Sequence, residues 1–116
     1  MASANADTAA TFTRRAHPAP VSAADRDAAI ANPGFGTVFT DHMASIDWSD
    51  GRGWHSATIG PREKLSLDPA TAVLHYAQEI FEGMKAYRLA DGAMALFRPE
   101  QNARRFNASA RRLAMP

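Results

Sequence analysis

The chain has 116 residues, 46% of them hydrophobic, and its 13 Lys and Arg against 12 Asp and Glu give a net charge of +1. This length matches one small domain and excludes a two-domain enzyme within it, because domains most often run to roughly 100–150 residues. The balanced charge gives no support to nucleic acid or an anionic membrane as a partner.

Cysteine is absent, which excludes disulfides, thiolate nucleophiles and zinc sites built on cysteine. No stretch approaches the roughly twenty apolar residues of a membrane span, and residues 1–20 lack the apolar run of a signal peptide. We therefore expect a soluble, cytoplasmic chain with neither nucleic acid nor membrane as its partner.

Residues 1–34 are rich in Ala, Ser, Thr, Asp and Pro and contain few large apolar side chains. Such a composition does not repay the entropy cost of ordering the backbone, so we predict a flexible leader. Residues 24–31 have the composition for a helical turn or two, which Pro33 and Gly34 would end. Folded structure is expected over residues 35–116.

The next elements in chain order are predicted to form a hairpin. Residues 37–48 are rich in β-branched and aromatic types, residues 49–53 supply turn chemistry, and residues 54–59 form a second strand. Further along, Asp68 and Pro69 have the residue types of an N-cap and a first helical position, which predicts a short helix ending near Tyr76.

Residues 79–90 alternate in character and predict a strand, with Phe81, Gly83, Lys85 and Tyr87 on one face. Asp91 and Gly92 then predict a tight turn into residues 93–97. A second helix is predicted over residues 99–113. Its buried stripe would be formed by residues at helical spacing, namely Ala103, Phe106, Ala110 and Leu113. The predicted fold class is α+β, with antiparallel hairpins and two helices.

Four arginines on the last predicted helix, Arg104, Arg105, Arg111 and Arg112, allow two interpretations. They could form a solvated basic face favoured by the helix dipole. Alternatively, Arg105, beside the apolar stripe, could bind phosphate or carboxylate through the planar fork of its guanidinium.

Lys85 also has two readings, as a surface residue whose alkyl chain covers apolar neighbours or as a functional lysine. The second reading would make it a Schiff-base nucleophile or a positive charge facing a carboxylate substrate. Neither metal nor serine chemistry is indicated: the four histidines His17, His42, His55 and His75 form no ligand pair, and no nucleophile elbow or phosphate-binding glycine loop is present.

Several runs closely resemble the N-terminal part of branched-chain amino-acid aminotransferases. They include Phe-Gly-Thr-Val-Phe-Thr-Asp-His-Met at 35–43, His-Tyr at 75–76 with Phe-Glu-Gly-Met-Lys at 81–85, Phe-Arg-Pro at 97–99 and Ser-Ala-Arg-Arg-Leu at 109–113. The resemblance extends from about residue 35 to residue 116. It implies an incomplete N-terminal domain of a fold-type IV pyridoxal-phosphate enzyme.

The family uses pyridoxal 5′-phosphate to transfer the amino group of Leu, Ile or Val to 2-oxoglutarate. The resemblance implies that Arg105 binds the cofactor phosphate, and that Tyr76, Phe81, Gly83 and Lys85 line the substrate pocket. It implies a homodimer for the complete enzyme. The family's Schiff-base lysine lies further along than this sequence reaches, so we expect a fragment that is inactive by itself.

Other readings remain open at this point. Within the same class, a D-amino-acid aminotransferase or an aminodeoxychorismate lyase is the nearest competitor, although the run at 81–85 favours the branched-chain type. Outside it stand a non-catalytic binding or interaction module and, supported only by the arginine cluster, a nucleic-acid binder.

Overall fold

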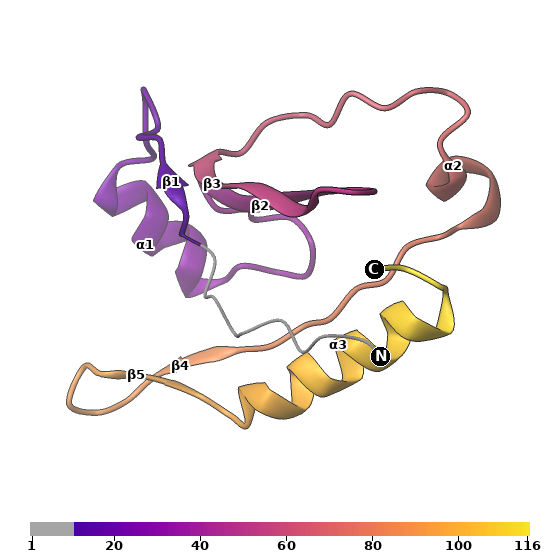
Figure 1. Ribbon diagram of the computed structural model, residues 1–116. Coiled ribbons are helices and arrows are strands. Elements are labelled where there is room, and N and C mark those ends of the chain that lie inside the picture. Colours follow the sequence, from indigo (N-terminus) through magenta and orange to yellow (C-terminus); the bar gives the residue numbers. More distant parts are fainter. Residues whose placement is uncertain (1–10) are drawn as a thin grey trace. The chain divides into compact units, whose positions relative to one another are not determined.

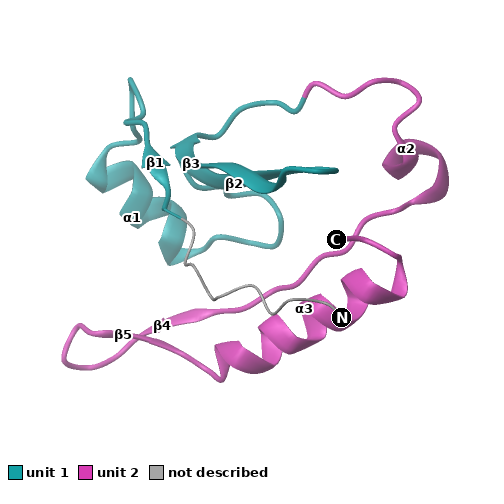
Figure 2. Ribbon diagram, in the orientation of Figure 1, with its two compact units in different colours: residues 1–65 teal, residues 66–116 magenta. Residues whose placement is uncertain are grey.

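The computed structural model describes residues 11–116, which divide after Leu65 into two compact units (Figure 2). Residues 1–10 of the predicted leader lie outside the described residues. Together the units contain helices and small sheets of antiparallel or mixed pairing, which confirms the α+β prediction.

The first unit is built on a three-stranded sheet (Figure 1). Its elements in chain order are β1 (Thr13–Arg14), α1 (Ala23–Ala31), β2 (His42–Ser49) and β3 (Gly53–Pro61). Strand β3 lies in the middle, parallel to β1 and antiparallel to β2. The hairpin predicted from turn chemistry is confirmed: Trp48 lies opposite Trp54, and Gly51 in the turn has a φ of +76° that favours glycine.

The first hairpin strand begins later than predicted, at His42 rather than near residue 37. Its partner decides this start, because His42 pairs with Pro61, the last residue of β3. Only one further backbone bond continues the pairing, from the Arg62 amide to the Asp41 carbonyl at 2.8 Å. β-branched composition without a partner strand is not enough to make a ladder.

Helix α1 and strand β1 fall in the segment for which composition predicts a flexible leader. The side chain of Ser22 caps α1 by accepting a hydrogen bond from the Asp25 amide at 3.1 Å. The helix has nine residues, longer than the turn or two expected, and it brings the helices of the described residues to three rather than two.

The second unit contains α2 (Ala72–Tyr76), β4 (Ala86–Arg88), β5 (Met94–Leu96) and α3 (Pro99–Arg112). Helix α2 ends where predicted but does not begin at Pro69, and its N-cap is Thr71 rather than Asp68. The Asp68 side chain instead closes a local turn by accepting from the Ala70 amide at 2.7 Å. The prediction was wrong because aspartate can organise a turn as readily as a helix start.

The long strand predicted over residues 79–90 is also shorter in the structure. Only β4 forms, paired antiparallel with β5 in the order Ala86 to Leu96 and Arg88 to Met94. The turn at Asp91 and Gly92 is confirmed, with Gly92 at a φ of +83°. Residues 79–85 run along α3 without ladder bonds among the described residues, so their alternation does not make them a strand.

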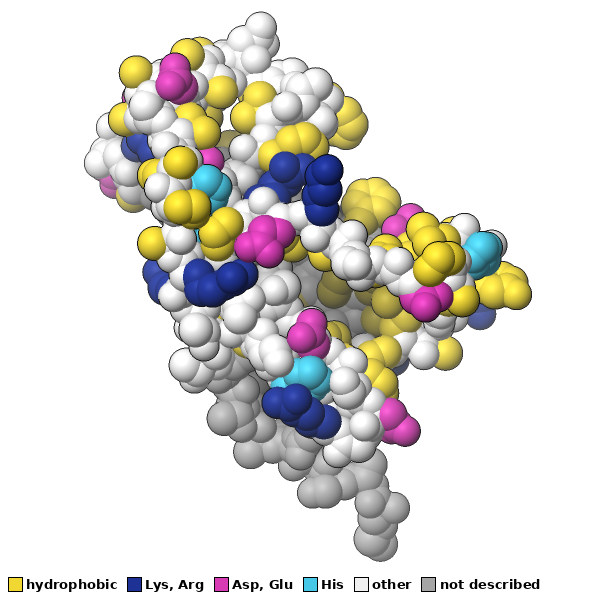
Figure 3. All heavy atoms as spheres, turned by 90° about the horizontal axis from the view of Figure 1, so that it is seen from above, with side chains coloured by type: hydrophobic (Ala, Val, Ile, Leu, Met, Phe, Trp, Pro, Cys, Tyr) yellow, Lys and Arg dark blue, Asp and Glu magenta, His cyan; other side chains and the backbone are white. Residues whose placement is uncertain are grey.

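Helix α3 matches its predicted extent, with Pro99 in its first turn, but its predicted apolar stripe is not buried. Phe106 is 40% and Leu113 37% exposed, and no apolar side chain of residues 11–116 is buried. Figure 3 shows hydrophobic side chains at the surface beside charged ones. In this part of the chain no helix is long and apolar enough to cross a membrane.

Candidate functional site

The candidate site is centred on Arg105 in the second unit. Its guanidinium faces Glu82: Nε donates a hydrogen bond to Oε2 at 2.5 Å, and Nη2 donates to Oε1 in a second, parallel contact. This is the two-pronged geometry in which arginine binds a carboxylate. The Glu82 side chain is only 11% exposed, whereas that of Arg105 is 69% exposed.

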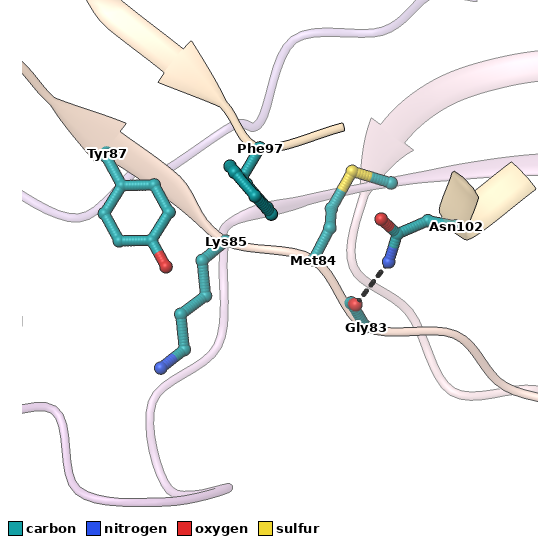
Figure 4. Close-up of a pocket in the computed structure, with 6 residues that line it drawn as sticks. All are labelled: Gly83, Met84, Lys85, Tyr87, Phe97 and Asn102. Atoms are coloured by element: carbon teal, nitrogen blue, oxygen red, sulfur yellow. Dashed lines mark hydrogen bonds between the residues drawn. The ribbon is translucent and has the colours of Figure 1, made fainter. Parts of the chain in front are cut away.

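Glu82 is fixed by further partners. Its Oε1 accepts a hydrogen bond from the Gly83 amide at 2.9 Å and another from Asn102 Nδ2 at 3.1 Å. The same Asn102 nitrogen also donates to the Gly83 carbonyl at 2.9 Å (Figure 4). The carboxylate is therefore anchored from its own segment and from helix α3.

The local fold explains why these side chains meet. Asn102 and Arg105 are three residues apart on α3 and so project from the same side of the helix. Residues 78–83 run along that helix in the opposite direction, since Gln78 donates from Nε2 to the Leu113 carbonyl at 3.1 Å while Glu82 meets Asn102. The antiparallel run places Glu82 opposite Arg105.

This pairing governs the electrostatics of the site. The hydrogen bond from Arg105 lowers the pKa of the Glu82 carboxyl from 4.5 to about 2, against an opposing effect of burial. The bonds from Gly83 and Asn102 lower it further. In the other direction, Glu82 raises the pKa of Arg105 above its ordinary value. Both groups are thus charged at neutral pH, as a stable ion pair.

Arg105 also lines an open pocket beside α3. Its other lining residues include the apolar Ile80 and Phe81, the acidic Glu79, the hydroxyl-bearing Ser109 and a second arginine, Arg112. A guanidinium carries five N–H donors, and two of those on Arg105 bond to Glu82. The remaining donors suit a phosphate or carboxylate, and the anion-binding role of Arg105 stays a prediction.

A second pocket lies next along the chain and is drawn in Figure 4. Its lining residues come from the segment before β4, from β4 itself, from the position after β5 and from the first half of α3, namely Gly83, Met84, Lys85, Tyr87, Phe97 and Asn102. Lys85 is exposed, and Figure 4 shows its side chain on the side of Tyr87 rather than of Asn102. Nothing would contact a Cβ at Gly83 within 4 Å, so this position is open space.

The predicted site residues are thus divided between pockets. Phe81 shares the first with Arg105, while Gly83 and Lys85 share the second. Tyr76, 84% exposed at the end of α2, lines neither of the two. Their roles in binding stay predictions.

Sequence reasoning missed Glu82 and Asn102. The predicted strand put Glu82 on the face opposite Phe81 and Lys85, and Glu82 lies 23 positions before Arg105 in the sequence. The sequence does place Asn102 one turn before Arg105, a spacing that could have marked it as a neighbour. Among the described residues no group of three or more histidine and acidic side chains could hold a metal ion.

Comparison with known proteins extends this picture. No family model matches the chain. A probable branched-chain-amino-acid aminotransferase of Streptomyces coelicolor is 64% identical over 97 residues, which cover 84% of this chain. A branched-chain-amino-acid aminotransferase of Mycolicibacterium smegmatis is 55% identical over 105 residues, or 90% of the chain. A cytosolic one of Saccharomyces cerevisiae is 50% identical over 82 residues, or 71%.

Identity at this level over most of the chain defines its class as that of the aminotransferases. Within that class, the chain belongs to the branched-chain-amino-acid aminotransferase family, as the resemblance of its motifs indicated. It spans only 27% of the Streptomyces relative, 28% of the Mycolicibacterium relative and 22% of the Saccharomyces relative.

Proposed function

We propose that this chain is the N-terminal portion of a pyridoxal-phosphate-dependent enzyme that transfers the amino group of Leu, Ile or Val to 2-oxoglutarate. The observation that carries the proposal is 64% identity to an aminotransferase of which the chain spans about a quarter. The complete protein would act as a homodimer in the cytoplasm. The names of two yeast relatives give different compartments, since one is called cytosolic and the other mitochondrial.

The guanidinium of Arg105 is the feature of the site that fits a cofactor carrying a phosphate group. Arg105 is largely exposed and keeps N–H donors that Glu82 does not use, and such donors suit a phosphate monoester. When bound, pyridoxal phosphate supplies the electron sink and carries the amino group. Arg105 would hold the phosphate and so fix the orientation of the ring.

The other predicted residues would shape the substrate pocket. Phe81 and Tyr76, both strongly exposed in this chain, offer aromatic surface for a branched aliphatic side chain. Gly83 leaves room for close approach, since no atom would meet a Cβ there. Lys85 would place positive charge near a substrate carboxylate. By the resemblance, Lys85 is not the Schiff-base residue, so the 116-residue chain alone would not transaminate.

The phosphate assignment is tested by comparing two arginines of α3 in the complete protein. Arg105→Ala should weaken retention of pyridoxal phosphate at least tenfold, because it removes charge-assisted bonds to the phosphate. Arg111→Ala removes the same charge from the same helix and should change retention little. Cofactor absorbance after dialysis measures both, and equal losses would refute the role of Arg105.

The inactivity of the chain alone has its own test. The purified 116-residue chain, incubated with pyridoxal phosphate and leucine, should form keto acid no faster than the same mixture without protein, and borohydride should label Lys85 no more than the other exposed lysine, Lys64. Turnover above that background would contradict the predicted inactivity, and labelling concentrated at Lys85 would indicate that Lys85 is the Schiff-base residue.

A further inference from the structure

Glu82 is held too firmly to act as a mobile counter-ion for Arg105. Both of its carboxylate oxygens are bonded: Oε2 to Arg105, and Oε1 to Arg105, Asn102 and the Gly83 amide. Its side chain is 11% exposed. To leave Arg105, the carboxylate would have to break bonds to α3 and to its own backbone together.

The same contacts occupy only one edge of the Arg105 guanidinium. Glu82 takes the edge of the guanidinium formed by Nε and Nη2, and no bond to Nη1 is found among residues 11–116. The side chain carrying this second edge is 69% exposed and lines the pocket that Ser109 and Arg112 also line. An isolated exposed arginine would sample many rotamers, and fixing it in one of them costs side-chain entropy.

We propose that Glu82, anchored by Asn102, is a positioning residue that holds one edge of the Arg105 guanidinium so that the opposite edge is presented to a phosphate group. The inference rests on the proposed function, in which that phosphate belongs to the cofactor. The entropy of ordering Arg105 is then lost on folding rather than on binding, which tightens binding of the anion.

In the competing interpretation, Glu82 only weakens anion binding, because a carboxylate beside Arg105 repels an incoming phosphate. The two readings predict opposite signs. If Glu82 positions Arg105, removing it weakens phosphate binding. If it only adds negative charge, removing it strengthens binding. The fixed geometry of the carboxylate favours the first.

The experiment measures dissociation constants of the complete protein for pyridoxal phosphate, for pyridoxal, which lacks the phosphate, and for inorganic phosphate in competition. Glu82→Gln should weaken binding of the two phosphate-bearing probes by about tenfold, the size expected for one charge-assisted bond. Pyridoxal should bind unchanged. A loss shared equally by pyridoxal would indicate a general structural defect and would overturn the proposal.

Two further variants separate position from charge. Glu82→Asp keeps the charge but shortens the side chain by one methylene, so it should also weaken phosphate binding. Glu79→Gln removes a carboxylate that lines the same pocket but has no bond to Arg105 in the structure. It should leave phosphate binding unchanged or slightly tighter. Unchanged or tighter binding in Glu82→Gln, or full affinity in Glu82→Asp, would contradict positioning.

Arg105 itself supplies a readout that does not depend on cofactor. Its Nε–H resonance should be shifted and protected from solvent exchange in the wild type, and both effects should be lost in Glu82→Gln. Arg105→Ala distinguishes failure of the proposed phosphate role of Arg105 from failure of the positioning role of Glu82. If it does not selectively weaken the phosphate-bearing probes, the proposed phosphate role fails. If it does, while Glu82→Gln does not, only the positioning role fails.

Discussion

The ion pair between Glu82 and Arg105 joins a carboxylate that is mostly shielded from solvent to a largely exposed guanidinium, so water affects the two ends differently. Water screens the exposed end, so this pair contributes less to stability than a buried one would. Its importance lies in geometry, because it fixes the direction of a residue proposed to bind phosphate. Glu82 and Asn102, which make this geometry, are ordinary surface residue types. Nothing in the sequence therefore marked them as candidate site residues.

The pairing predicts a distinctive acid titration. Because the folded pKa of Glu82 is lowered from 4.5 to about 2, the ionised form stabilises the fold. That stabilisation is complete above about pH 4.5 and is lost as the pH falls through 2. Carbon-13 NMR of the carboxyl should show Glu82 titrating near 2 in the folded chain.

Arg105→Ala provides the control for that titration. Without the guanidinium, the largest cause of the shift is gone, so the pKa of Glu82 should return toward its ordinary value. The Gly83 amide and Asn102 would still hold it somewhat low. A Glu82 carboxyl that titrates near 4.5 in the wild type would mean that the pair does not form in solution.

At the scale of elements, turn chemistry predicted more reliably than alternation did. Both hairpins have glycine at positive φ where the sequence places turn residues, and this requirement is local. The strand predicted over residues 79–90 needed a neighbour, and pairing begins only at Ala86. Helix α2 begins three residues after Pro69 because Asp68 bonds to the turn instead.

Two glycines of the second unit offer a matched test of these arguments. Gly92 has a φ of +83°, so Gly92→Ala should destabilise the β4–β5 hairpin by about 1 kcal/mol. Gly83 has an ordinary φ and open space around it, so Gly83→Ala should leave the fold unchanged. Backbone amide exchange in residues 86–96 measures the difference.

Function should respond in the reverse order. If Gly83 lines the substrate pocket as proposed, Gly83→Ala in the complete protein should raise KM for branched-chain substrates while Gly92→Ala changes it little. Equal hydrogen exchange in the two variants would contradict the turn argument, and an unchanged KM in Gly83→Ala would contradict the pocket role.

At the scale of the whole molecule, many large apolar side chains of residues 11–116 are exposed to solvent. Phe35, Tyr76, Phe81 and Phe97 are 75–101% exposed, and no apolar side chain is buried in the part of the chain that the structure describes. Helix α3 is amphipathic in sequence, but none of its apolar side chains is fully shielded from water among the described residues. Exposed apolar surface of this kind is typical of sites that contact other polypeptide or that cause aggregation.

The 116-residue chain by itself should therefore unfold over a broad temperature range and bind a hydrophobic dye such as ANS strongly. The complete protein proposed above should melt sharply and bind the dye weakly, because its remaining residues would cover these side chains. Calorimetry and dye fluorescence at equal molar concentration make the comparison. A single sharp transition and weak dye binding by the short chain would argue for a self-sufficient module.

The sequence by itself determined the family, the α+β class, both tight turns and the extent of α3, because motif identity, turn residues and helical spacing are local properties. It also singled out Arg105 as the arginine to consider. Only the tertiary structure decided that residues 79–85 run along α3 instead of forming a strand, that the α3 stripe stays partly exposed, and that Glu82 and Asn102 meet Arg105. These depend on contacts between residues some twenty positions apart, which no local pattern encodes.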